Sequence, residues 1–188
     1  MYRLLTIGFS AGGIPLAQHI FAALPASYPM PIAVVAHLPA GEDCDLVEVL
    51  ASSTALRVVM AEDKSPLEPG MVYVAPPDYH LLVEKSGRLA LSVDPPVKSV
   101  RPSIDVLFQS AAEAFEKDLI AVALSGANSD GVQGMAAVKE LGGLTIVLDP
   151  LQTDIHTLPA AVVEAVDVDY VANIEEIASL LRAALEQA

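Results

Sequence analysis

The sequence lacks most of the features that would place it outside an ordinary intracellular setting. It has a single cysteine, Cys44, and no tryptophan, so an intrachain disulfide is impossible. One thiol and scattered histidines do not have the ligand spacing of a zinc site, and we expect neither a metal nor a cofactor. No apolar run reaches the roughly 18 residues needed to span a membrane, and the N-terminus lacks the basic and apolar regions of a signal peptide. These absences predict a cytoplasmic protein without membrane insertion.

Positive charge is also scarce. The chain has ten Lys and Arg against 24 Asp and Glu, which gives a formal net charge of −14. Nucleic acids and anionic membrane surfaces are bound through basic patches that neutralise phosphates, so this balance argues against both as partners.

Aliphatic residues, by contrast, are abundant and fall into short runs. Hydrophobic residues make up 53% of the chain and aromatic residues only 5%, which suits buried strands covered by helices. Apolar runs bounded by turn residues predict strands, at residues 3–7, 32–36, 57–60, 71–75, 119–124, 144–148 and 170–172. Segments with helical spacing alternate with them, at residues 14–24, 45–52, 103–115, 133–141, 159–165 and 174–185.

This alternation predicts an α/β fold with three layers. We expect a mostly parallel, doubly wound sheet with helices on both faces. Two short strands at residues 80–84 and 88–93 flank Lys85-Ser86-Gly87 and predict an inserted antiparallel hairpin. The length of 188 residues, without a repeat or a linker, predicts one domain over residues 1–188.

The first candidate functional residue is Ser10, in the segment Gly8-Phe9-Ser10-Ala11-Gly12. This segment fits the pattern G-x-S-x-G and follows a predicted strand. In that setting a serine is exposed on a sharp turn, and backbone N–H groups at the start of the next helix can stabilise an oxyanion. The same glycines also suit a phosphate loop or a plain structural turn, and the motif alone does not decide among the three.

Two further residues favour the nucleophile. His37 directly follows the strand predicted at 32–36, and Asp130 lies in the loop after the strand predicted at 119–124. The carboxyl ends of parallel strands meet at one edge of a sheet, where ligand sites form in open α/β folds. Ser10, His37 and Asp130 are thus a nucleophile, a base and an orienting acid expected at one edge. Each alone is more often a loop residue, and together they leave catalysis and plain structure evenly matched.

Five blocks of the sequence carry a family resemblance. They are IGFSAGG at residues 7–13, AHLP at 36–39, PGMVYVAPPDYH at 69–80, RPSIDVLF at 101–108 and LSGANSDG at 124–131. In this order they resemble the catalytic domain of the chemotaxis protein-glutamate methylesterase (CheB-type) family. The resemblance implies a serine hydrolase that demethylates glutamate methyl esters on chemoreceptors, with glutamine deamidation in some members.

The same resemblance implies a role for each site residue. Ser10 matches the nucleophile, His37 the base and Asp130 the orienting acid. The backbone N–H groups of Ala11 and Ala127 are the implied oxyanion donors. A methylated chemoreceptor, or a similar signalling protein, is the implied partner. The family's phosphoreceiver domain is not encoded in this sequence, so we expect any receiver domain to come from a separate chain.

The chain departs from the family pattern around these blocks. Ala36, Glu42 and Val100 stand where the family usually has Gln, Phe and His, and Ala127-Asn128 replaces Met-Gly before the acid. These changes leave two rivals to a receptor methylesterase. One is a catalytically weak homologue that serves as a signalling binding module, and the other is a small-molecule esterase. Turnover of a generic ester separates the binding module from both enzymes, and turnover of methylated receptor separates the two enzymes.

Overall fold

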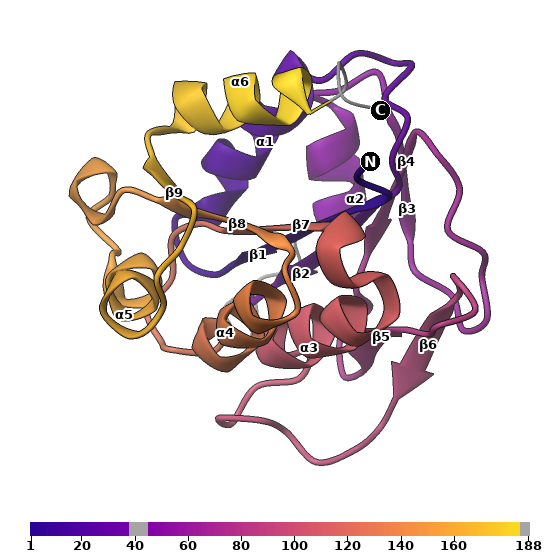
Figure 1. Ribbon diagram of the computed structural model, residues 1–188. Helices are drawn as coiled ribbons and strands as arrows, with labels where there is room; N and C mark the ends of the chain where they lie inside the picture. The colour runs from indigo at the N-terminus through magenta and orange to yellow at the C-terminus, as the bar shows by residue number, and fades with distance from the viewer. Residues whose placement is uncertain (38–44, 185–188) are drawn as a thin grey trace.

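The computed structural model describes residues 1–37 and 45–184, which form a three-layer α/β domain (Figure 1). Its main sheet has seven parallel strands in the order β3-β4-β2-β1-β7-β8-β9. These strands are β1 (Leu4–Phe9), β2 (Ile32–Ala36), β3 (Arg57–Met60), β4 (Met71–Val74), β7 (Leu119–Ala123), β8 (Leu144–Leu148) and β9 (Tyr170–Ala172). The predicted hairpin is present as a separate antiparallel sheet of β5 (His80–Val83) and β6 (Leu89–Ser92). The predicted fold class is confirmed.

Helices cover both faces of the sheet (Figure 1). They are α1 (Gly13–Ala23), α2 (Leu46–Ala51), α3 (Ile104–Phe115), α4 (Val132–Glu140), α5 (Thr157–Ala165) and α6 (Ile174–Ala183), with short 3-10 turns at Glu116–Asp118 and Pro150–Gln152. Helices α1, α2 and α6 share one hydrophobic core with the sheet, and α3, α4 and α5 share the other. Every predicted element is found, with ends that differ by at most two residues, as is usual at element boundaries.

The chain winds outward from β1 in both directions. Strand β1 pairs with β2 on one side and with β7 on the other. The helix that follows β1 packs on one face of the sheet, whereas the helix that follows β7 packs on the opposite face. The two connections therefore diverge at the carboxyl ends of β1 and β7, and a crevice at such a switch point is where open α/β sheets bind ligands.

Two glycines allow the start of α3 to approach this crevice. A Cβ atom added at Gly8 in β1 would lie 2.4 Å from Cγ2 of Ile104, the first residue of α3. A Cβ added at Gly134 in α4 would lie 2.6 Å from Cβ of Phe108 in α3. Helix α3 therefore packs directly on both β1 and α4, which brings its N-terminus close to the loop that carries Asp130.

No helix within residues 1–37 and 45–184 is long and apolar enough to cross a membrane. Residues 38–44 lie outside the described part of the chain, and Glu42 and Cys44 are among them.

Candidate active site

Ser10 and His37 directly follow neighbouring parallel strands. Phe9 pairs with the last residue of β2, and the His37 N–H donates a hydrogen bond of 3.0 Å to the Phe9 carbonyl. Side chains alternate between the two faces along a strand. Ser10 therefore lies on the same face as Gly8, and His37 on the same face as Val35, and both faces pack against α3. The two side chains leave adjacent strands toward the same layer of helices.

The turn that carries Ser10 is fixed to the loop after β7. The Ser10 N–H donates to the Ser125 carbonyl at 2.9 Å, and the buried Ser125 hydroxyl donates to the Ala11 carbonyl at 2.9 Å. Gly12 adopts a left-handed conformation with φ 77°, and a Cβ there would lie 3.3 Å from the Ser125 oxygen. Ser125 is a site residue that was not predicted, and its only signal in the sequence was its position just after a predicted strand and near the acid.

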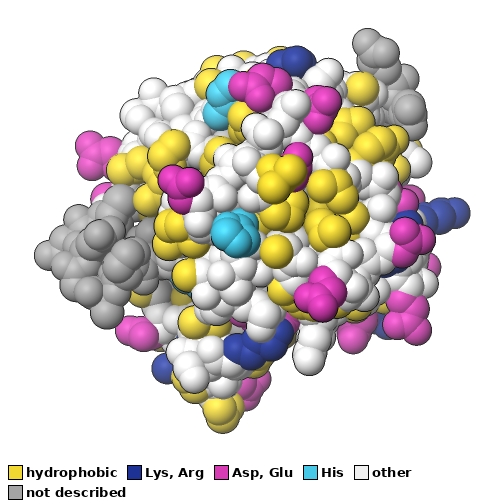
Figure 2. All heavy atoms as spheres, turned by 90° about the vertical axis from the view of Figure 1, so that its left-hand side faces the viewer, with side chains coloured by type: hydrophobic (Ala, Val, Ile, Leu, Met, Phe, Trp, Pro, Cys, Tyr) yellow, Lys and Arg dark blue, Asp and Glu magenta, His cyan; other side chains and the backbone are white. Residues whose placement is uncertain are grey.

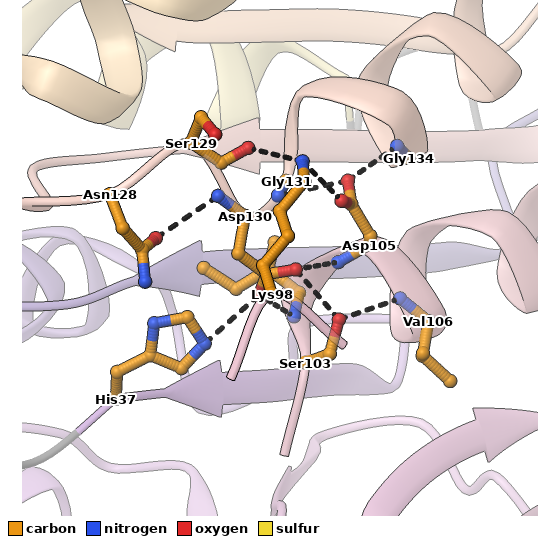
Figure 3. A network of polar contacts seen from close by, with 11 residues as sticks. His37, Lys98, Ser103, Asp105, Val106, Asn128, Ser129, Asp130, Gly131 and Gly134 are labelled. Atoms are coloured by element: carbon orange, nitrogen blue, oxygen red, sulfur yellow. Dashed lines mark hydrogen bonds and ion pairs between the residues drawn. The ribbon is translucent and has the colours of Figure 1, made fainter. Parts of the chain in front are cut away.

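His37 and Asp130 are in contact (Figure 3). Nε2 of His37 lies 3.0 Å from Oδ2 of Asp130, although the ring is turned off the line of a well-aligned hydrogen bond. Catalytic hydrogen bonds are commonly loose before substrate binds. With a carboxylate facing Nε2, a neutral imidazole carries its proton on that nitrogen. Nδ1 is buried and has no hydrogen-bond partner among the described residues, so its lone pair is free to accept a proton.

The Asp130 carboxylate is fully buried at the N-terminus of α3. It accepts hydrogen bonds from the Ser103 hydroxyl at 2.7 Å, the Ile104 N–H at 2.6 Å and the Asp105 N–H at 3.3 Å. Burial raises the pKa of this carboxyl, but the contact with His37 and the hydrogen bonds from Ser103 and Ile104 lower it and prevail. The pKa of Asp130 therefore lies below its ordinary value, and a helix N-terminus is a favourable place for the resulting anion.

The two predicted oxyanion donors lie in adjacent loops. Ala11 belongs to the turn after β1, and Ala127 is exposed in the loop after β7. A Cβ added at Gly126 would lie 3.1 Å from Cβ of Ser10, so these loops touch beside the serine. Within residues 1–37 and 45–184, neither alanine N–H donates a hydrogen bond. Both N–H groups are therefore free to bind a ligand atom, and their catalytic role stays a prediction.

A third segment borders this site. The Gly126 N–H donates to the Ile155 carbonyl at 3.1 Å, and the Leu158 N–H donates to the Gly126 carbonyl at 2.9 Å. The same segment between β8 and α5 carries the exposed His156 and Leu151, the latter with 90% of its surface exposed. Figure 2 shows one face of the molecule on which hydrophobic side chains gather around a histidine and few Lys or Arg side chains are visible.

Most of the residues that depart from the family pattern lie in the described part of the chain. Ala36 ends β2, and Val100 closes a tight turn that precedes α3. Asn128 accepts a hydrogen bond from the Asp130 N–H at 3.0 Å through its side-chain oxygen. Glu42 lies outside the described residues.

Ser103 has a larger role than the sequence indicated. It is the N-cap of α3, and its hydroxyl oxygen accepts from the Val106 N–H at 3.3 Å. It also donates to Asp130, a contact across 27 residues for which the sequence carried no signal. Lys98 and the buried Asp105 contact the same loop, and neither was predicted as a site residue.

The chain is also similar to known proteins. A family model described as CheB methylesterase matches residues 5–181. A Leptospira interrogans protein with the provisional name protein-glutamate methylesterase/protein-glutamine glutaminase is 45% identical, over 95% of this chain and 93% of its own length. Protein-glutamate methylesterase FrzG of Myxococcus xanthus is 38% identical over 84% of this chain, which spans about half of FrzG, 47%.

A solved structure extends the likeness to the fold. The catalytic domain of the Thermotoga maritima CheB methylesterase superimposes with a TM-score of 0.90 at 35% sequence identity, covering 96% of this chain and 97% of that domain. The chain therefore belongs to the CheB methylesterase family.

Proposed function

We propose that this chain hydrolyses glutamate methyl esters on chemoreceptor proteins, with Ser10 as nucleophile, His37 as base and Asp130 as orienting acid. One observation carries the proposal. The His37 ring contacts a buried carboxylate through Nε2 and leaves Nδ1 without a partner among the described residues, beside the strand end that carries Ser10. Family membership and the names of the relatives support the choice of substrate.

In the acylation step, Nδ1 of His37 takes the hydroxyl proton of Ser10 while the serine oxygen attacks the ester carbonyl carbon. The Asp130 carboxylate keeps the Nε2 proton in place and stabilises the imidazolium that forms. The tetrahedral oxyanion then collapses, the bond to the methoxy group breaks, and His37 returns its proton to the leaving oxygen. Methanol departs and a glutamyl ester of Ser10 remains.

Deacylation repeats these steps with water in place of the serine hydroxyl. His37 takes a proton from water, the hydroxide oxygen attacks the acyl carbon, and the Ser10 oxygen leaves with the proton from His37. The products are free enzyme and a glutamate side chain. A glutamine side chain would follow the same course, with ammonia leaving in place of methanol.

The N–H groups of Ala11 and Ala127 are the proposed oxyanion donors. Backbone donors that are already in place act without reorganisation as negative charge develops on the carbonyl oxygen, and removing one such donor typically costs about 10²–10³ in turnover. Both loops are held by backbone hydrogen bonds to neighbouring segments, through Ser10 and Gly126. This anchoring supports a preorganised oxyanion site.

We further propose that the matched region acts as one catalytic domain in the cytoplasm, with a methylated chemoreceptor as its protein partner. The acidic surface, with a net charge of −14, supports a protein partner over nucleic acid.

The deciding experiment measures methanol release from a methylated receptor fragment and hydrolysis of a generic ester, with wild-type protein and Ser10→Ala side by side. We expect the wild-type protein to turn over both substrates and the variant neither. Ester hydrolysis without methanol release would support the small-molecule esterase. Binding of the receptor fragment with no turnover of either substrate would support the binding module.

A further inference from the structure

A tight turn before α3 places Lys98 against the loop that carries Asp130. Val97 and Val100 exchange backbone hydrogen bonds of 3.1 and 2.9 Å across Lys98 and Ser99. Both central residues have positive φ, 48° and 68°, a conformation that is uncommon for residues other than glycine. The Lys98 ammonium group lies 2.8 Å from Oδ2 of Asp105 and 2.8 Å from the Ser129 carbonyl.

Asp105 continues this network on its other side. It is a buried residue in the first turn of α3. Its second oxygen, Oδ1, accepts hydrogen bonds from the Gly131 N–H at 2.9 Å and the Gly134 N–H at 2.8 Å. The Lys98–Asp105 ion pair therefore contacts the residue before Asp130 and the residue after it (Figure 3).

These contacts determine where the Asp130 backbone lies relative to α3. The Asp130 side chain is bonded to Ser103 and Ile104 at the start of that helix. Its flanking backbone is bonded to a carboxylate from the same helix turn and to the lysine that neutralises it. The acid is thus attached to α3 both through its side chain and through its neighbours, which leaves little freedom to turn away from His37.

Lys98 also compensates negative charge at the start of α3. The Asp105 and Asp130 carboxylates both lie at the N-terminus of α3, and the Asp105 N–H lies 3.3 Å from Oδ1 of Asp130. Two carboxylates at the same helix N-terminus repel each other unless a cation or N–H groups compensate them. Lys98 supplies that cation, with its side chain 31% exposed and the Asp105 side chain 2% exposed.

We propose that Lys98 and Asp105 are positioning residues that hold Asp130 at the distance and angle at which it orients His37. This inference rests on the proposed function, because it takes Asp130 as the orienting acid. It gives the turn before α3 and the first turn of that helix a part in catalysis that acts through Asp130. A merely structural pair would change stability alone, so the test must measure turnover in folded protein.

The test compares Lys98→Met with Lys139→Met as a matched control. Lys139 lies at the C-terminal end of α4, and its side chain is similarly exposed, at 35%. It forms an ion pair of 2.5 Å with Asp169. At a temperature well below unfolding, we expect Lys98→Met to lower kcat about tenfold with little change in KM, because small displacements of catalytic groups are costly. Lys139→Met should keep the wild-type kcat, and Lys98→Arg should recover most of the loss.

A second readout does not depend on turnover. The His37 Nε2 proton, hydrogen-bonded to a carboxylate, should give a downfield proton NMR signal that Asp130→Asn abolishes. We expect Lys98→Met to shift or broaden that signal and Lys139→Met to leave it unchanged. Asp105→Asn should change the NMR signal in the same way and more strongly. If Asp105→Asn does not fold, because Asp105 is buried, the test rests on Lys98→Met alone.

The outcomes separate this inference from the function on which it depends. Wild-type protein that turns over esters, together with a folded Lys98→Met of wild-type kcat and unchanged NMR signal, would overturn the positioning role and leave the proposed function intact. Wild-type protein without any ester turnover would overturn both. A loss of kcat in Lys139→Met equal to that in Lys98→Met would also overturn the inference, because the effect would then be a general one of lost ion pairs.

Discussion

Asp130 caps the N-terminus of α3, and Asp105 caps the N-terminus of α4. Asp130, just before α4, accepts hydrogen bonds from the backbone at the start of α3, and Asp105, in the first turn of α3, accepts them from the start of α4. Each carboxylate satisfies N–H groups that a helix leaves unpaired at its N-terminus. The proposed catalytic acid is therefore also a structural element, and its substitution should change both turnover and stability.

The first prediction concerns Asp130→Asn. An asparagine has one acceptor oxygen, so it cannot serve the α3 N-terminus and the His37 ring together. We expect kcat to fall about 10⁴-fold because the imidazole loses its orienting partner. Kinetics on a generic ester and urea unfolding measure the two effects. If chelation abolished the activity of the wild-type protein and a divalent ion restored it, Asp130 would be a metal ligand instead.

Ser10→Ala should behave differently. The Ser10 side chain is half-buried and its fixed contacts are made by the backbone, so removal of the hydroxyl should leave the unfolding free energy nearly unchanged. Turnover should fall on the order of 10⁶-fold, about 8 kcal/mol of barrier. A variant with near-wild-type ester hydrolysis and normal folding would show that another group is the nucleophile.

Stability should depend on pH through the Asp130 carboxyl. Its pKa is lowered in the fold, whereas an unfolded aspartate titrates near ~3.9. A lowered pKa stabilises the native state above the unfolded value, and this stabilisation is lost as the pH falls through the lower folded value. The unfolding free energy should therefore decline below about pH 4. Urea titrations at several pH values should show a shallower decline in Asp130→Asn, and equal slopes would contradict the assignment.

The close approach of β1 and α3 predicts a cost for Gly8→Ala. The added Cβ would lie 2.4 Å from Cγ2 of Ile104, so α3 must shift, at about 1–3 kcal/mol of unfolding free energy. The shift should also lower kcat, because the start of α3 holds Asp130. In the double variant Gly8→Ala/Ile104→Ala the overlap is relieved, and thermal unfolding should show a cost smaller than the sum of the single variants. If the costs of the two single variants simply added in the double variant, the contact between residue 8 and Ile104 would not be the source of the destabilisation.

A variant remote from the crevice provides the converse case. Asn173 and Glu176 form a capping box at the start of α6, with hydrogen bonds of 2.9 and 3.0 Å. Asn173→Ala should cost about 1 kcal/mol of stability. Its kcat should equal that of the wild type, because α6 packs on the face of the sheet opposite α3 and α4. A clear loss of kcat in folded protein would indicate coupling across the sheet.

The sequence by itself determined the fold class and the placement of Ser10 and His37. Strand periodicity is local, and the residue after a parallel strand lies at a known edge of the sheet, so both positions followed from apolar runs of five or six residues. Five blocks in a family's order then carried the resemblance that the family model and the Thermotoga maritima domain bear out. Helix periodicity was equally local, and the helix predicted at residues 103–115 begins in the structure right after its N-cap Ser103.

Tertiary structure alone decided what surrounds Asp130. Its partners at Ser103 and Ile104 lie 27 and 26 residues away in the chain, and Lys98 reaches Ser129 across 31 residues. No periodicity or cap signal encodes such distances. They arise because Gly8 and Gly134 let α3 pack against β1 and α4. The imidazole nitrogen that faces the acid was equally beyond the sequence, since it depends on how two loops from different strands meet.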